Sequence, residues 1–360
     1  DDYVDHFRFE PLVDDSLVVG FDEELAQIEA AVRRWQEGLT SSFVLYGQRG
    51  GGKTTLLNVA CERLFGDEDR LARHTFHEKH ITAHELATEL AGVLGLDGAA
   101  GVQGLSGQLL EGPRRVIVLE GCHNLFLRRI GGLEAIRNLL WLIARTNHHV
   151  LWGVCLDEYA RDYLARWLPF ARLFQEEIAI RPWAGDELRR LILRRHHLSG
   201  YRIRYETGPT VARALKRRVR RYRRLEEPAV QRALEEIYFE ELAEVCEENI
   251  LAALYYWLRS VQARTSDTLT VEPLVPLALA RVRDVSMDVS FLMAAILQHD
   301  NLTAVELASV TDGNPIDTRL ELEILWNQNV LAFDLDSGKF RLNPVALGPV
   351  VDALRTRNLL

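Results

Sequence analysis

Residues 47–55 read Gly47-Gln48-Arg49-Gly50-Gly51-Gly52-Lys53-Thr54-Thr55. The stretch fits the pattern G-x-x-x-x-G-K-[ST] without a mismatch. An apolar run at 43–46 precedes it and predicts a buried strand, and residues 54–60 predict the first turns of a helix. In such a loop the glycines let backbone N–H groups turn toward an anion, and the helix N-terminus adds partial positive charge. The sequence therefore predicts a binding site for a nucleoside triphosphate.

The predicted site has separate groups for phosphate and for metal. The Lys53 ammonium can reach the terminal phosphates, and the Thr54 hydroxyl can hold Mg²⁺. The motif Asn/Thr-Lys-x-Asp, which reads guanine, does not follow any later predicted strand. We therefore expect ATP or ADP, together with Mg²⁺, as the ligands of this loop.

A second predicted strand, at 115–119, ends in the acid Glu120. A carboxylate at this place can complete the metal shell, directly or through water. The next residue in a triphosphatase is often a Glu that orients the attacking water, but here it is Gly121. His123 is a candidate replacement for that base, or else a residue that only caps the strand end. We expect ATP hydrolysis that is slow or lost.

Composition limits the other function classes. The chain has 360 residues, enough for two or three domains, and a formal charge of -9, which argues against a surface coated with DNA. The four cysteines are widely spaced and match no zinc pattern, which favours buried thiols in a reducing cytoplasm. No apolar run approaches the roughly 20 residues needed to cross a bilayer. The chain begins at Asp1 rather than at a methionine, which is compatible with a segment of a longer protein.

The first predicted domain, residues 1–182, has a lead-in helix at 22–37 and then alternates strands and helices. The predicted strands are 42–46, 74–81, 115–119, 148–155 and 176–180. The predicted helices lie near 53–64, 83–94, 131–145 and 157–167. This alternation predicts a three-layer α/β/α fold around a parallel sheet.

Strand patterns then vanish, and residues 183–284 predict an α-helical lid, with helices at 185–197 and 230–261. The lid contains a basic run that begins at Arg213 and ends at Arg224, without an acid between them. Apolar residues recur through the run at helical spacing, so we expect a basic helix at 213–224. Such a helix can hold nucleic-acid phosphates or pair with acidic protein surface. Nucleic acid is the less favoured of the two.

Residues 285–360 predict a winged-helix domain. Helices are expected at 291–298 and at 316–327. Between them, a capping box formed by Thr303 and Glu306 predicts the start of a further helix. Short strands at 330–334 and 339–342 surround a hairpin turn, and a closing helix follows Pro344. Acidic residues outnumber basic ones here, including in the presumed recognition helix. Because phosphates repel such a surface, we expect a protein-contact or autoinhibitory role.

The order of parts resembles the AAA+ superfamily, nearest its origin-recognition-like and signal-transducing (STAND-type) branches. The likeness covers about residues 16–262 and is carried by 18–25, the phosphate loop, 116–120 and 171–174 with the segments that follow. It implies that Val18 and Val19 pack on adenine. It also implies that Arg172, with Arg166 as second choice, is an arginine finger that completes the site of a neighbouring subunit in an oligomer.

Two departures from that family matter for activity. The lid motif Gly-Asn-Pro, with its sensing arginine, is absent at 248–254, and the phosphate-sensing position after strand 148–154 is Cys155 or its neighbour. We therefore favour a nucleotide-controlled switch for assembly or signalling. The alternatives are a DNA-associated ATPase of the replication or transposition type that uses 213–224 and the winged helix, and a scaffold in which ATP is only structural.

Overall fold

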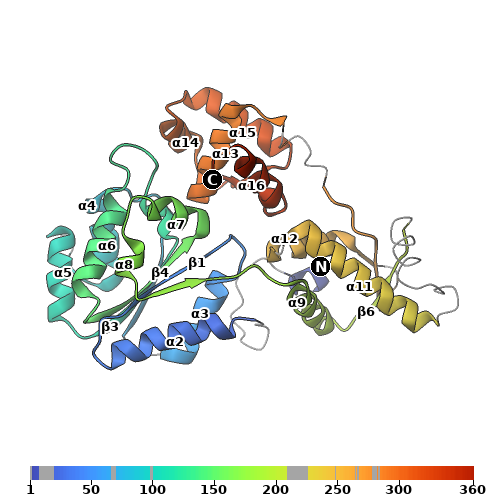
Figure 1. The fold of residues 1–360 in the computed structure, drawn as a ribbon, viewed down its shortest axis with the longest axis horizontal. Helices are drawn as coiled ribbons and strands as arrows, with labels where there is room; N and C mark the ends of the chain where they lie inside the picture. The colour runs from blue at the N-terminus through green and yellow to red at the C-terminus, as the bar shows by residue number, and fades with distance from the viewer. Residues whose placement is uncertain are drawn as a thin grey trace. The chain divides into compact units, whose positions relative to one another are not determined.

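The computed structural model describes residues 2–7, 20–65, 70–97, 100–208, 226–247, 249–263, 265, 267–277, 282 and 284–360. These residues form two compact units, which are treated separately below (Figure 1). One unit combines residues 21–181 with 279–360, and the other combines 1–20 with 182–278. No helix among the described residues is both long and apolar enough to cross a membrane.

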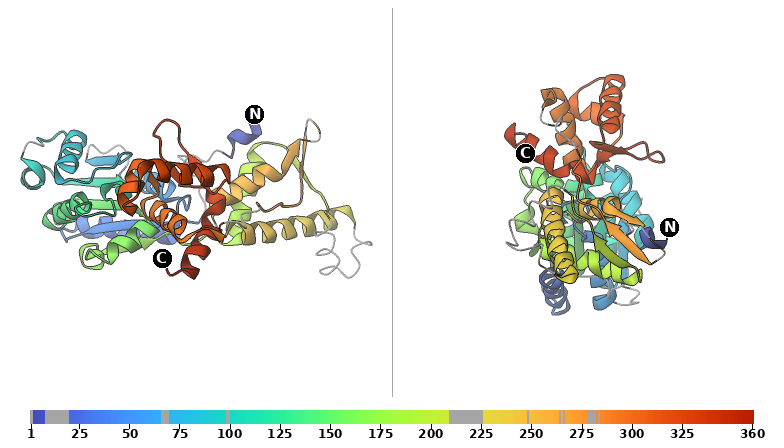
Figure 2. Two further views of the ribbon diagram at one scale, coloured as in Figure 1. Left: turned by 90° about the horizontal axis from the view of Figure 1, so that it is seen from above. Right: turned by 90° about the vertical axis from the view of Figure 1, so that its right-hand side faces the viewer.

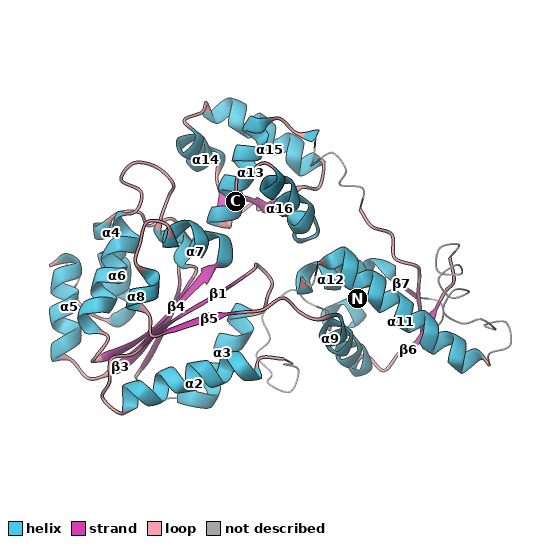
Figure 3. Ribbon diagram, viewed as in Figure 1, coloured by secondary structure: helices cyan, strands magenta, loops and turns pink. Residues whose placement is uncertain are grey.

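A five-stranded parallel sheet forms the centre of residues 21–181, which we call the core (Figure 3). Its strands are β1 (Ser42–Gly47), β2 (Leu71–Thr75), β3 (Arg115–Glu120), β4 (Val150–Asp157) and β5 (Glu176–Ala179), in the order β2-β3-β4-β1-β5. Strand β4 lies beside β1, with Asp157 in register with Gly47. The end of β4 and the loop after β1 are therefore neighbours at the same edge of the sheet.

Helices cover both faces of this sheet (Figure 1). On one side lie α2 (Asp22–Gln36) and α3 (Lys53–Phe65). On the other lie α4 (Ala83–Leu94), α6 (Glu134–Thr146) and α8 (Phe170–Leu173), with α5 (Gly101–Glu111) packed on α4 and α6. Helix α7 (Glu158–Ala165) follows β4, and a short 3-10 turn, Cys122–Leu125, follows β3. The predicted three-layer fold is confirmed.

One predicted strand of the core is misplaced, and one helix was missed. The strand expected at 74–81 is β2 at Leu71–Thr75, and residues 76–82 form a loop whose backbone bonds to the segment after β3. Helix α5 was not predicted at all. Its glycines weaken helix propensity, although Val102, Leu105 and Leu109 recur at helical spacing and are buried.

The described residues of the second unit, in the segment 182–278, form helices and a small sheet (Figure 2). The helices are α9 (Gly185–Leu198), α11 (Glu227–Cys246) and α12 (Ile250–Ser260), and the strands are β6 (Arg202–Tyr205), β7 (Val261–Ala263) and β8 (Thr268–Val271), in the order β6-β8-β7. The α-helical lid was predicted without these three short strands, and the helix expected at 230–261 is two helices. The basic run 213–224 lies outside the described residues.

The N-terminal turn α1 (Asp2–Asp5) packs into this second unit. Phe7 is fully buried, and its ring contacts Trp257. The Tyr3 hydroxyl accepts a hydrogen bond from Trp257 Nε1 at 3.0 Å. Burial raises the pKa of Tyr3 well above its ordinary value, so the hydroxyl stays protonated.

Residues 284–360 form the C-terminal subdomain, which packs with the core. Its elements are α13 (Met287–His299), β9 (Asn301–Leu302), α14 (Ala304–Thr311), α15 (Pro315–Asn327), β10 (Leu331–Phe333), β11 (Phe340–Leu342), the 3-10 turn Pro344–Ala346 and α16 (Leu347–Thr356). The capping box of Thr303 and Glu306 is present. Three helices followed by a hairpin is the arrangement predicted from the sequence.

Candidate phosphate-binding site

The loop between β1 and α3 requires glycine at several positions. Gly50 and Gly52 have φ angles of 77° and 96°, which side-chain-bearing residues rarely adopt. A Cβ on Gly52 would lie 2.5 Å from the Phe21 ring, and one on Gly47 would lie 2.9 Å from Ile180 Cβ. The loop is therefore a backbone-lined turn at the N-terminus of α3, which suits an anion.

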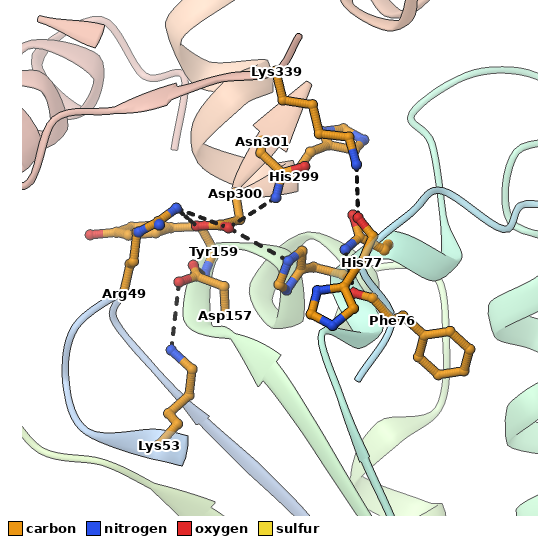
Figure 4. Close-up of polar contacts among 12 residues, drawn as sticks. Arg49, Lys53, Phe76, His77, Asp157, Tyr159, His299, Asp300, Asn301 and Lys339 are labelled. Carbon is orange, nitrogen blue, oxygen red and sulfur yellow. Dashed lines mark hydrogen bonds and ion pairs between the residues drawn. The ribbon is translucent and has the colours of Figure 1, made fainter. Parts of the chain in front are cut away.

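Lys53 begins α3, and its ammonium turns back over the loop. Its Nζ donates to the carbonyl oxygens of Gly47 at 2.7 Å and Gln48 at 2.8 Å. It also lies 3.8 Å from Asp157 Oδ2 at the end of β4 (Figure 4). Thr54 and Thr55 follow in the first helical turn and are half-buried. The structure thus brings the predicted lysine, threonines and glycines together.

Asp157 is a site residue that the sequence analysis missed. The strand continues two residues beyond Cys155, so the acid at its end lies beside the loop. The Asp157 carboxylate is buried and caps α7 by accepting a hydrogen bond from the Tyr159 N–H. Burial raises the pKa of Asp157 to about 7, against the opposing charge of Lys53. An acid directly after an apolar strand and before a helix is the pattern that could have revealed it.

Asp157→Asn is expected to gain free energy of unfolding over wild type, and this gain should be about 1–3 kcal/mol larger at pH 8 than at pH 4.5. The folded-state pKa lies above the ordinary value of 3.8, so the folded protein holds this proton more tightly than the unfolded chain and loses stability as pH rises toward 7. Asn removes the titration and still caps α7. Urea unfolding at both pH values measures the effect. Asp162→Asn, on the exposed side of α7, is the control, and a gain that does not change with pH would contradict the assignment.

Glu120 lies at the end of β3, as predicted, and is buried. Its Oε1 accepts hydrogen bonds from Arg73 on β2, at 2.8 Å from Nε and 2.6 Å from Nη2. Arg73 also donates to Asn58 on α3 at 2.7 Å. One carboxylate oxygen of Glu120 is therefore held by an arginine, which fixes the side chain in position and reduces the charge available to a metal ion.

The residue after Glu120 leaves no space for a side chain. Gly121 has a φ of 66°, and a Cβ there would lie 2.5 Å from the carbonyl oxygen of Phe76. Burial lowers the pKa of the neighbouring His123 to about 3, and the nearby cations Lys79, Lys53 and Arg49 act in the same direction. His123 is therefore neutral at pH 7 and a poor proton acceptor, contrary to the sequence-based suggestion of a replacement base.

The C-terminal subdomain reaches the phosphate loop. Asp300, which follows α13, accepts hydrogen bonds from Nη1 of Arg49 at 2.9 and 3.1 Å (Figure 4). The two residues are 251 positions apart in the chain. Leu127 and Tyr159 of the core belong to the same buried apolar cluster as Met293 and Ile296 of α13. A loop residue that was predicted to bind phosphate is thus also bound to a carboxylate.

Other predicted site residues are not brought into this site. Arg172, on α8, and Arg166, after α7, are exposed, as residues facing a neighbouring subunit would be, and their role as arginine finger stays a prediction. Val18 and Val19 lie outside the described residues. Within the part of the chain that is described, no group of three or more His, Cys, Asp or Glu side chains could hold a metal ion.

The parallel α/β sheet and the glycine loop between β1 and α3 define a P-loop fold. The resemblance of this core to AAA+ ATPases stays a prediction from the sequence.

The chain is 36% identical over 109 residues to the negative regulator of genetic competence ClpC/MecB of Bacillus subtilis. This match covers 28% of the chain and 12% of that protein. The Aeropyrum pernix ORC2 protein is similar with a TM-score of 0.44 and 14% identity, covering 99% of this chain and 98% of that one. For Cdc6p of Pyrobaculum aerophilum the TM-score is 0.45 at 14% identity, covering 100% and 99%. No family model matches the sequence.

Proposed function

We propose that this chain is an ATP-binding AAA+-type module that acts as a nucleotide-controlled switch for assembly or signalling and hydrolyses ATP slowly or not at all. The observation that carries the proposal is the geometry of the phosphate loop. A Cβ at Gly47 or Gly52 would clash with a neighbouring side chain, and the Lys53 ammonium donates to the Gly47 carbonyl oxygen. Lys53 would bind the terminal phosphates, and Thr54 with Glu120 would hold Mg²⁺, which neutralises phosphate charge when bound.

Weak hydrolysis follows from what surrounds the end of β3. Gly121 has no side chain to orient water, and none fits there. His123 is a poor base, and one oxygen of Glu120 is bound to Arg73. Asp157, whose carboxylate lies 3.8 Å from Lys53, is partly protonated near neutral pH, and burial also raises the pKa of the adjacent Glu158. A general base at this site would therefore be a carboxylate that is hydrogen-bonded to an arginine or one that is partly protonated. Either state favours slow turnover.

Nucleotide control is supported by the packing of the C-terminal subdomain on the core beside the phosphate loop. A ligand that binds one arrangement of this contact better than another shifts the population of arrangements. We propose self-association into a homo-oligomer, or binding to a larger assembly, as the output, with Arg172 completing a neighbour's site. The four cysteines, all buried and free, fit a cytoplasmic location.

The test is titration calorimetry with ATP, ADP and GTP in the presence of Mg²⁺, followed by a turnover assay. We expect binding of ATP and ADP, little binding of GTP, and bound ATP that stays intact for many minutes. Absence of heat with both adenine nucleotides would reject the proposal. Rapid multiple turnover that Glu120→Ala abolishes would reject the claim of weak hydrolysis. Size measurement with and without ATP tests the assembly step.

The alternative is a DNA-associated ATPase, and α15 does not support it. Its apolar residues Ile316 and Leu320 are 79% and 59% exposed, where a DNA reader would carry polar groups. The one basic side chain of α15, Arg319, is bound to Glu323 at 2.6 Å and stacks on Phe333. This surface suits a protein partner better than phosphates. Salt-dependent DNA binding that is lost when 213–224 is neutralised would support the alternative.

A further inference from the structure

Helix α15 of the C-terminal subdomain carries an apolar stripe that faces solvent. Ile316, Leu320 and Ile324 recur at i, i+4 and i+8, so their side chains form one row along the helix. Their exposed fractions are 79%, 59% and 42%. Leu322 and Leu325 of the same helix are buried in the subdomain, so the stripe is additional to the packing that holds α15 in place. A continuous exposed row of large aliphatic side chains is typical of a protein contact surface.

Negative charge borders the α15 stripe. Asp317 and Glu321 form a second row on the helix, one position after each of the first two stripe residues. The basic side chain Arg319 is bound to Glu323, so its charge is balanced within the helix. The α15 stripe with its border is therefore apolar and acidic. A surface that covers it has to supply apolar area together with positive charge.

Helix α6 of the core presents that complementary chemistry. Arg137, Trp141 and Arg145 recur at i, i+4 and i+8, and all three are exposed, Trp141 by 43%. We call them the α6 row. The acid of α6, Glu134, lies in the first turn of the helix, before this row begins. Tryptophan and arginine are the residue types that most often dominate the binding energy of protein interfaces, so the α6 row is itself a candidate contact surface.

We propose that the α15 stripe of one copy of this chain docks on the α6 row of a second copy. The inference rests on the proposed function, because it names the surfaces of the self-association step. The two rows match in length, since each runs from i to i+8, about 12 Å of helix. Trp141 would pack on the aliphatic stripe, while Arg137 and Arg145 would face Asp317 and Glu321.

Both rows belong to the same compact unit and both are exposed there, so neither covers the other within one chain. The two surfaces are different, and the contact is therefore heterologous. Each association leaves one α15 stripe and one α6 row open at the ends, so growth continues until a ring closes or a filament forms. Neither row contains a residue of the phosphate loop, so the contact can be tested separately from nucleotide binding.

The test is charge reversal followed by rescue in a mixture. One variant combines Arg137→Glu with Arg145→Glu, and the other combines Asp317→Lys with Glu321→Lys. Each variant alone brings like charges together, so we expect its self-association, measured by sedimentation velocity, to weaken at least about thirtyfold. A one-to-one mixture of the two variants places acids opposite bases again and should restore the assemblies of wild type. Such rescue requires that the rows meet on different copies.

Two further variants separate this contact from a general effect of charge. Arg33→Glu combined with Arg34→Glu makes the same change of charge on α2, which covers the opposite face of the sheet, and should leave association unchanged. Trp141→Ala changes no charge and is expected to weaken association about thirtyfold. Circular dichroism checks that each variant is folded.

The outcomes distinguish this inference from the proposed function. Undiminished association of both charge-reversed variants, or a loss that the mixture does not recover, overturns the inference. Wild type that binds ATP but remains monomeric with and without it also overturns the inference, while nucleotide binding stands. Association with the expected rescue in a protein that binds no nucleotide supports the inference and rejects the proposed function.

Discussion

Replacing Lys53 with alanine is expected to weaken ATP binding by about a hundredfold or more, because a charge-assisted hydrogen bond contributes about 1.5–3 kcal/mol and Lys53 would make more than one to the phosphates. The substitution also removes the ammonium that faces Asp157 at 3.8 Å, so the loop loses its positive charge next to the phosphates. Titration calorimetry with ATP and Mg²⁺ measures the loss.

The control is Arg34→Ala, which removes an exposed cation from α2 and should leave affinity unchanged. Circular dichroism and thermal unfolding of the Lys53 variant separate lost binding from lost folding, since Nζ also bonds two loop carbonyls. ATP affinity within threefold of wild type in a folded variant would mean that this loop does not hold the phosphates.

Placing Glu at position 121, where triphosphatases often carry one, is expected to lower the free energy of unfolding by about 3–5 kcal/mol. The backbone at Gly121 is left-handed, and a Cβ would lie 2.5 Å from the Phe76 carbonyl oxygen, which is backbone and cannot swing aside. We therefore expect Gly121→Glu to unfold readily and not to gain ATPase activity. Urea unfolding and a phosphate-release assay measure the two effects.

Gly131 provides a matched control for this substitution. Its φ of 78° is similarly left-handed, but nothing lies within 4 Å of a Cβ there. Gly131→Glu therefore carries only the conformational strain, about 1–2 kcal/mol. Equal losses for the two variants would show that strain alone, and not the Phe76 carbonyl, excludes a side chain at 121. A folded Gly121→Glu protein that turns over ATP would contradict the proposed loss of activity.

The sequence correctly predicted those elements whose geometry depends on residues a few positions apart. The loop at 47–55 and the cap at Thr303 each depend on residues within a few positions, and both have the expected geometry. Strand β2 was misplaced because the polar stretch 74–81 has strand-like alternation, whereas its register is decided by pairing with β3. Strands β6 and β8 are four residues each and pair across more than sixty positions, so no local pattern reveals them.

The candidate site shows the same division. Lys53, Thr54 and Glu120 were predicted because the motif and the strand end mark them in sequence. Asp157 and Arg73, which contact Lys53 and Glu120, come from other strands, and these contacts exist only after folding. Arg49 was predicted as a phosphate ligand, but its carboxylate partner could not be anticipated because it is 251 positions away.

That long sequence separation has a consequence for synthesis of the protein. Arg49 leaves the ribosome well before Asp300, and at about 5–20 residues per second the interval is roughly 12–50 s. During this time a nascent core whose sheet has formed would present its phosphate loop without the opposing carboxylate. Under the proposed function, ATP would therefore reach the phosphate loop before Asp300 is synthesised, and the completed chain would already hold a nucleotide.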